Sequence, residues 1–179
     1  AVVVITSNRG LAGGYNSNVT KLVTKGELAE EELDIYAIGK KGREALQRAG
    51  YHIAMDCSDI CEEPTYADAA ALGREVLDSF AKGEVGEIWL AYTGFKNTVV
   101  HEPRLIKLLP VEKGEGGSQT DVPMNYEAEE ESILEMLIPK YMTSLIYGGL
   151  LEAVASENGA RMQAMDSATS NAEEMIEDL

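Results

Sequence analysis

Basic residues are scarce in this sequence. Its 179 residues include 15 Lys and Arg against 31 Asp and Glu, which gives a formal net charge of −16. A surface with this charge repels the phosphate backbone of nucleic acids and the head groups of anionic lipids. We therefore expect no nucleic-acid binding, and a protein as the partner.

Long hydrophobic runs are also lacking. No apolar run approaches the roughly 18–20 residues that a membrane span needs, and the run 1–5 has neither the length nor the basic flank of a signal peptide. We expect no direct membrane insertion. The chain begins inside a strand-like run and stops inside a helical pattern without a capping glycine, so we expect native sequence beyond both ends.

Cysteine and histidine are too few to indicate a catalytic or metal site. Cys57 and Cys61 have a C-x3-C spacing with no second pair to complete a tetrahedral metal centre, so we expect reduced thiols. Nothing in the sequence pairs His52 or His101 with a Cys or Asp in the pattern of a catalytic triad. We therefore expect no catalytic residue, no metal and no cofactor.

What is present is a globular composition, with 45% hydrophobic and 26% charged residues, in which strand-like runs alternate with helical patterns. The expected strands are 2–6, 34–39, 51–55, 87–92 and 98–111, and the expected helices between them are 16–28, a Lys/Arg-rich helix ending at 49, and 66–81. Three β-α units predict a parallel sheet, and the short link before the last strand predicts an antiparallel hairpin at a sheet edge. Pro103 and Pro110 fit an edge strand. We predict the strand order 3-2-1-4-5.

The region 129–179 has a helical pattern, interrupted only by Pro139 and the pair Gly148 and Gly149. Residues spaced alternately by three and four predict a coiled-coil seam with two polar interruptions. The seam residues are Leu151, Val154, Asn158, Arg161, Met165, Ala168, Ala172, Met175 and Leu179. We expect this seam to face a helix from missing sequence or another chain, and otherwise to cause self-association.

These patterns predict an α/β fold with two parts. A Rossmann-like, mostly parallel five-stranded sheet with flanking helices occupies 1–126, ending in a mobile glycine-rich loop at 113–123, and half of a coiled coil occupies 127–179. Arg161 is the lone basic residue of the seam. We expect it to pair with a carboxylate of the partner helix and fix its register, or to contact a neighbouring subunit.

The glycine-rich segment 7–16 follows a strand and opens a helix, where a phosphate-binding loop would lie in a doubly wound fold. Its Gly10, Gly13 and Gly14 match neither G-x-G-x-x-G nor the P-loop. We interpret them as a tight turn that needs positive φ and close contact between helix and strand. The alternative is a small Rossmann-type nucleotide-binding domain or enzyme.

Two segments carry a family resemblance. The sequences ITSNRGLAGGYNSN at 5–18 and ASENGARMQAMDSAT at 155–169 resemble the two signature segments of the gamma subunit of F-type ATP synthase, and the similarity covers essentially the whole chain. The resemblance implies an α/β domain inserted between two helices that wind around each other as the central stalk, or rotor. It implies a non-catalytic subunit that mechanically couples proton or ion flow through the membrane ring to ATP synthesis in the alpha/beta ring.

The resemblance also implies partners and a site. The partners would be the alpha, beta and epsilon subunits and the membrane c-ring, with the protein peripheral to the cytoplasmic side of the bacterial cell membrane. Glu157, Arg161 and Met162 of the second segment match shaft positions at which coupling to beta is sensitive.

The sequence departs from the family pattern at three positions. Asn8 stands where Asp is usual, Ala12 where Cys is common, and Gly159 where Ala is usual. The first two are small changes in a turn. Gly159 lowers the helix propensity by up to about 1 kcal/mol relative to Ala.

Overall fold

The computed structural model describes residues 1–29, 31–111 and 130–178. The strands are β1 (Val2–Ile5), β2 (Asp34–Ile38), β3 (His52–Asp56), β4 (Ile88–Phe95) and β5 (His101–Leu109). The helices are α1 (Tyr15–Thr24), α2 (Lys40–Arg48), α3 (Tyr66–Ala81) and α4 (Glu130–Glu177), with a short 3-10 helix η1 (Ser58–Ile60) after β3.

The strands form one sheet in the order β3-β2-β1-β4-β5, as the sequence predicts. The first four run parallel, and β5 pairs antiparallel with β4 at the edge. Pro103 lies in β5 opposite Thr93. An edge strand tolerates this proline because one of its sides has no ladder to satisfy.

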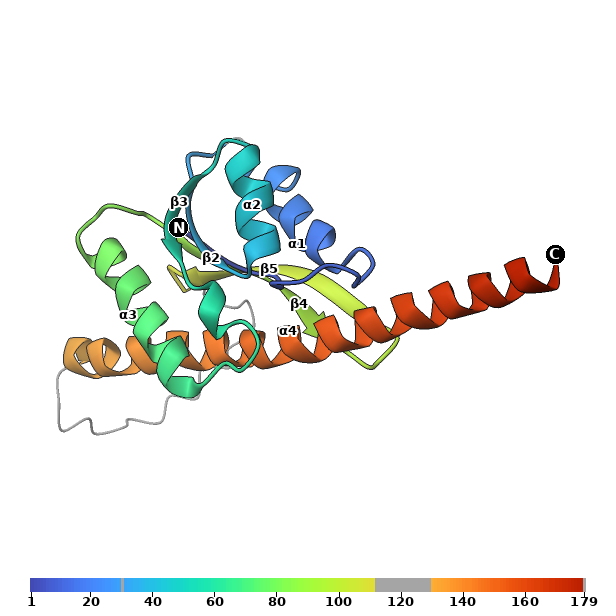
Figure 1. Cartoon of the computed structure of the whole chain (residues 1–179). Coiled ribbons are helices and arrows are strands. Elements are labelled where there is room, and N and C mark those ends of the chain that lie inside the picture. Colours follow the sequence, from blue (N-terminus) through green and yellow to red (C-terminus); the bar gives the residue numbers. More distant parts are fainter. Residues whose placement is uncertain (30, 112–129, 179) are drawn as a thin grey trace.

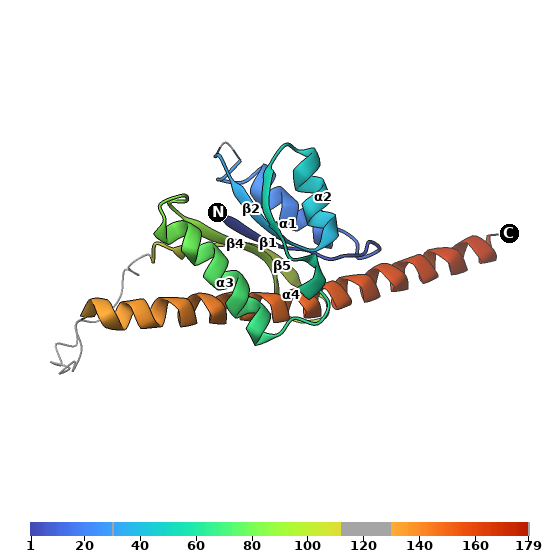
Figure 2. The same ribbon diagram turned by 60° about the vertical axis from the view of Figure 1, so that its left-hand side comes forward.

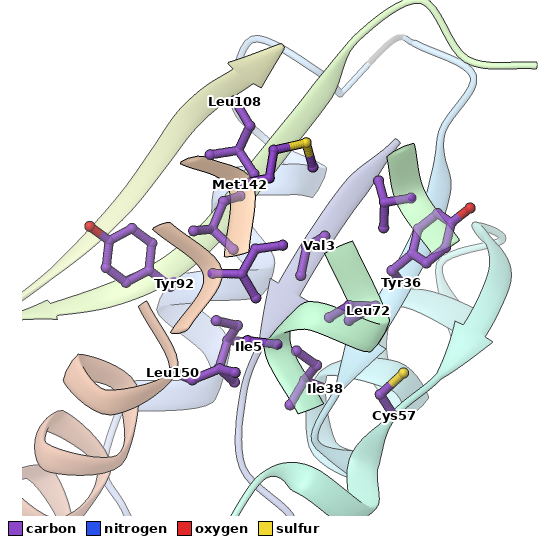
Figure 3. Close-up of a cluster of buried hydrophobic side chains, with 14 of the residues drawn as sticks. Val3, Ile5, Tyr36, Ile38, Cys57, Leu72, Tyr92, Leu108, Met142 and Leu150 are labelled. Carbon is purple, nitrogen blue, oxygen red and sulfur yellow. The ribbon is translucent and has the colours of Figure 1, made fainter. Parts of the chain in front are cut away.

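The sheet lies between two layers of helices (Figure 1). The β-branched run of β1 is buried on both sides, with Val2 and Val4 in the core under α1 and α2, and Val3 and Ile5 in the core under α3 and α4. Parallel strands covered on both faces have this continuous apolar character instead of alternation. Figure 3 shows the second of these cores, in which side chains of the sheet, α3 and α4 converge.

Helix α4 packs on the sheet through only part of its length. Met142, Ile146, Leu150 and Ala153 recur at helical spacing, are at most 2% exposed, and belong to the core shared with α3. From 165 to 178 every residue is exposed. Figures 1 and 2 show this end of α4 extending far beyond the α/β domain.

The face of α4 that contacts the sheet differs from the predicted seam. Leu150 is 1% exposed, whereas the seam residues Leu151, Met165 and Met175 are 47%, 43% and 70% exposed. Both faces carry apolar residues at spacings of three and four, so periodicity alone does not say which one packs on the sheet. The seam remains a prediction about a partner.

Some of the expected boundaries differ from those of the structure or fall outside the described residues. Helix α1 ends at Thr24 instead of 28, because Leu28 reaches the core from a turn in which Ala29 N donates to the Gly26 carbonyl oxygen. The division at 126/127 and the loop at 113–123 both lie outside the described ranges. None of the helices within those ranges is long and apolar enough to cross a membrane.

Candidate functional site

The segments 5–18 and 155–169 meet where β1 ends and α4 leaves the sheet. Arg161 Nη2 donates to the Gly10 carbonyl oxygen at 3.4 Å, across 151 positions of sequence. The same nitrogen lies 2.8 Å from Glu157 Oε1, one helical turn earlier in α4. The side chains of Arg161 and Glu157 are 18% and 10% exposed. This mostly buried ion pair therefore fastens α4 to the first turn.

The first turn is held in shape by its own polar side chains. Asn16 Oδ1 accepts from the Ser7 backbone N–H at 2.9 Å, and Asn16 Nδ2 donates to Ser7 Oγ at 2.9 Å. Of the three glycines only Gly13 has a positive φ, 57°, and Leu11 is the other left-handed residue with φ 61°. The interpretation as a tight turn needing positive φ is thus confirmed at Gly13 and wrong for Gly10 and Gly14.

Asn8 connects the first turn to two neighbouring elements. Its Nδ2 donates to the Ser58 carbonyl oxygen at 2.9 Å, and its Oδ1 accepts from the Lys40 backbone N–H at 3.1 Å at the start of α2. An aspartate could accept the second bond but could not donate the first. Asparagine at this position therefore makes two connections, of which aspartate could make only one.

Tyr15 makes a second connection between the first turn and α4. Its hydroxyl donates to the Ala153 carbonyl oxygen at 3.2 Å, and the residue is 5% exposed. Burial raises the pKa of Tyr15 far above its ordinary value, and the Glu157 carboxylate adds to this effect. The phenol is therefore neutral and serves as a donor.

The two cysteines lie beside this junction as free, buried thiols, as expected. Cys61 Sγ donates to the Thr6 carbonyl oxygen at 3.0 Å. Burial raises the pKa of Cys61 to about 12, with a contribution from Glu157, and burial raises that of Cys57 to about 11. Both groups are protonated at neutral pH and are poor nucleophiles.

The β4–β5 hairpin makes the third connection to α4. Ser156 Oγ donates to the Thr93 carbonyl oxygen and Gln163 Nε2 to the Val99 carbonyl oxygen, each at 3.3 Å. Between them, Gly159 lies against the hairpin so closely that a Cβ there would be 2.7 Å from His101 Nε2. No sequence pattern indicates this contact, because it depends on the crossing of α4 and β5.

The three residues assigned to the shaft from the resemblance do not form one group. Glu157 and Arg161 contact each other, while Met162 is 52% exposed. From the sequence we expect Arg161 to pair with a carboxylate of a partner helix or to contact a neighbouring subunit. Its partner here is Glu157 of its own helix, because an i,i+4 carboxylate lies within reach on the same face.

Metal and nucleotide chemistry find little support in the described part of the chain. No group of three His, Cys, Asp or Glu side chains within those residues could hold a metal ion. A hollow of about 640 Å³ opens at the start of β1 and β2, but its lining includes Glu27, Glu32, Asp34, Glu84 and Glu87. This acidic lining would repel a nucleotide's phosphates.

Comparison with known proteins gives matches over the whole chain. The family model for ATP synthase matches residues 1–179. The chain is 59% identical over 188 residues to the ATP synthase gamma chain of Lachnoclostridium phytofermentans, and 36% identical over 198 residues to the sodium ion specific gamma chain of Acetobacterium woodii. All of this chain is matched in both cases, and it spans 65% and 66% of their lengths, just under two thirds.

A solved structure has the same fold. The central stalk/c-ring part of the Tetrahymena thermophila mitochondrial ATP synthase contains a chain that superimposes with a TM-score of 0.72 at 26% identity. The superposition covers 94% of this chain and 75% of that one. The family model that matches every residue shows that the chain belongs to the ATP synthase family.

Proposed function

We propose that this chain forms the foot and one helix of the central rotor of an F-type ATP synthase. In this role it mechanically couples ion flow through the membrane ring to ATP synthesis in the alpha/beta ring. It holds no catalytic site of its own. We assign 1–126 to the foot and 127–179 to the shaft.

The observation that supports this proposal most is the fastening of one long helix to an α/β domain. Helix α4 is buried in the core at Met142 through Ala153, and it is tied beyond the core by Arg161 and Gln163. From 165 to 178 the helix extends free of the domain (Figure 2). A shaft that transmits torque must be attached to its domain at several points. A hinge at the same place would let α4 and the α/β domain turn independently.

The proposed partners follow from the two ends of this body. The alpha and beta subunits would surround the free end of α4, and the epsilon subunit and the c-ring would contact the α/β domain. The protein would be peripheral to the cytoplasmic side of the bacterial membrane. Glu157 and Arg161 would hold the shaft to the first turn, and Met162, which is exposed, would contact beta.

The experiment compares variants of the full-length gamma chain in complete ATP synthase in membrane vesicles. We expect Arg161→Ala to lower the ratio of ATP synthesis to ATP hydrolysis severalfold. The substitution removes the contact between α4 and the first turn and leaves the catalytic subunits intact. Arg104→Ala is the matched control, since Arg104 is an exposed arginine paired with Glu102 on the edge strand. An unchanged ratio in Arg161→Ala would contradict the proposed role of this contact.

The nucleotide-binding alternative has its own test. We expect calorimetry of the chain with ATP to give no binding, because its glycine-rich turn matches no nucleotide motif. Binding of one ATP with micromolar affinity would favour a Rossmann-type nucleotide-binding domain instead.

A further inference from the structure

The two helix layers of the domain carry opposite charge. Helices α1 and α2 cover one face of the sheet, and α3 and α4 cover the other (Figure 1). Within their bounds α1 and α2 contain five basic residues and one acidic residue, whereas α3 and α4 contain three basic and twelve acidic residues. The layer formed by α1 and α2 is therefore a positively charged surface on a chain whose net charge is −16.

Most basic side chains of this layer are exposed and have no acidic partner. They are Lys21, Lys40, Lys41 and Arg48, with Lys25 directly after α1. None of these five forms an ion pair with another residue in the part of the chain that the structure describes. The one acidic residue of the layer, Glu44, lies 3.9 Å from Arg43, which also pairs with Asp56. The layer therefore keeps its positive charge.

The spacing of these side chains matches the length of a short helix. Lys41 and Arg48 lie seven positions apart, which places them on one face of α2, roughly 10 Å from each other at 1.5 Å per residue. Helix α1 packs beside α2 and adds Lys21, and no other helix covers the outer side of the two in Figures 1 and 2. Two turns of a partner helix span the same length and can present carboxylates along one face.

The surroundings favour a compact protein segment over a membrane or a nucleic acid. Glu27, Glu31 and Glu32 are exposed in the turn after α1, beside the basic layer. A flat anionic membrane or a long nucleic acid would also approach these carboxylates and be repelled by them. A short segment can contact the basic side chains alone.

We propose that the layer formed by α1 and α2 docks an acidic helical segment of a partner protein. Lys21, Lys41 and Arg48 pair with its carboxylates. None of the large exposed apolar residues lies in α1 or α2, so the binding is mainly electrostatic, weak and sensitive to salt. A contact of this kind speeds the encounter with the partner and sets its orientation. This surface goes beyond the rotor function proposed above and does not depend on it.

The test measures binding of a helical, alanine-rich peptide that bears Glu at every third or fourth position, by calorimetry and by the amide resonances of the chain. We expect saturable binding that weakens with added salt and shifts resonances of α1 and α2 but not of α3. The same peptide with Gln in place of Glu should not bind. Changing Lys21 and Lys41 together to Gln should weaken binding about fivefold, because two exposed ion pairs are lost.

The matched control changes Arg74 and Lys140 together to Gln. Both residues are exposed on the other layer, in α3 and α4, so the net charge changes equally while the proposed surface stays intact. This control should bind the Glu peptide like the parent. The Tm of both double variants should stay close to that of the parent, because exposed side chains contribute little to stability.

Four results would overturn the proposal. The first is a lack of saturable binding, and the second is equal binding of the Gln and Glu peptides. The third is an equal loss of affinity in both double variants, which would show an effect of net charge alone. The fourth is tighter binding to vesicles containing phosphatidylglycerol than to the Glu peptide, or self-association of the chain that disappears when Lys21 and Lys41 are changed. These last outcomes would assign the surface to a membrane or to a second copy of the chain.

Discussion

Gly159 lies inside α4, where alanine has the higher helix propensity, yet the structure gives glycine a reason. A Cβ at this position would lie 2.7 Å from His101 Nε2 and 3.1 Å from the Thr98 carbonyl oxygen. We expect Gly159→Ala to lower the free energy of unfolding by about 1–2 kcal/mol, because overpacking outweighs the gain in propensity of up to about 1 kcal/mol. Urea denaturation measures the change.

The same helix offers a matched control for this prediction. A Cβ at Gly148 would meet open space, so Gly148→Ala should stabilise the protein by up to about 1 kcal/mol. Adding His101→Ala to Gly159→Ala should recover part of the loss. If Gly159→Ala stabilises the protein as much as Gly148→Ala does, a Cβ at position 159 fits against the hairpin and the predicted overpacking is wrong.

The buried thiol of Cys61 predicts a loss of stability in alkali. Its pKa is raised to about 12 in the folded protein, whereas an unfolded cysteine loses its proton near pH 8.5. Between these values the folded state binds more protons than the unfolded state, so the free energy of unfolding falls as the pH rises. The slope is at most about 1.4 kcal/mol per pH unit for one group.

Comparing the parent with Cys61→Ala from pH 8 to pH 10 isolates this effect. The stability of Cys61→Ala should fall less steeply, whatever its stability at pH 7. Tyr15 and Cys57 also have raised pKa values, and they remain in both proteins. Equal slopes would show that burial does not raise the pKa of the Cys61 thiol.

At the scale of elements, strand order and element types were predictable because local and global signals agree. The β-branched run at 2–5 and the three β-α repeats require a parallel sheet, and the short link before β5 permits only a hairpin. Helix α3 is found at the predicted bounds, and its Thr65 and Asp68 form a capping box. These features depend on residues that are close in sequence.

The contacts that form the candidate site were less predictable, because they join residues far apart in sequence. The motifs at 5–18 and 155–169 could be recognised, but not that Arg161 reaches Gly10 or that Tyr15 reaches Ala153. Nothing in the sequence pattern distinguishes Thr93 or His101 from other strand residues. Their contacts with α4 depend on how α4 crosses the β4–β5 hairpin.

The free end of α4 predicts weak self-association of this chain. The seam residues Met165 and Met175 are 43% and 70% exposed on a helix that has no neighbour there in the described residues. Covering such a stripe is favourable by about 25 cal/mol per Å² of apolar surface. Sedimentation over a wide concentration range should show a weak dimer.

Substitution on this stripe supplies the control. Changing Met165 and Met175 to Lys should make the chain monomeric without altering its fold. Hydrogen exchange should be fast beyond 165 in the monomer, because no tertiary packing protects those amides. A parent that is strictly monomeric and fully protected there would contradict the seam.

At the scale of the whole molecule, an α/β domain carries one long helix, α4, whose C-terminal end extends beyond the domain. Three connections join them, namely the core around Met142 to Ala153, the first turn through Arg161 and Tyr15, and the hairpin through Ser156 and Gln163. A body of this kind turns as a unit. In the proposed rotor, rotation of the α/β domain turns the free end of α4, and rotation of that end turns the domain.

Observing single molecules during ATP hydrolysis tests this claim most directly. The full-length gamma chain would be assembled with its alpha and beta subunits held on a surface, and a bead attached through Gln47→Cys, an exposed position on α2, while Cys57 and Cys61 stay buried. We predict that ATP makes the bead rotate persistently in one direction. A bead that stays still or fluctuates without direction while ATP is hydrolysed would contradict it.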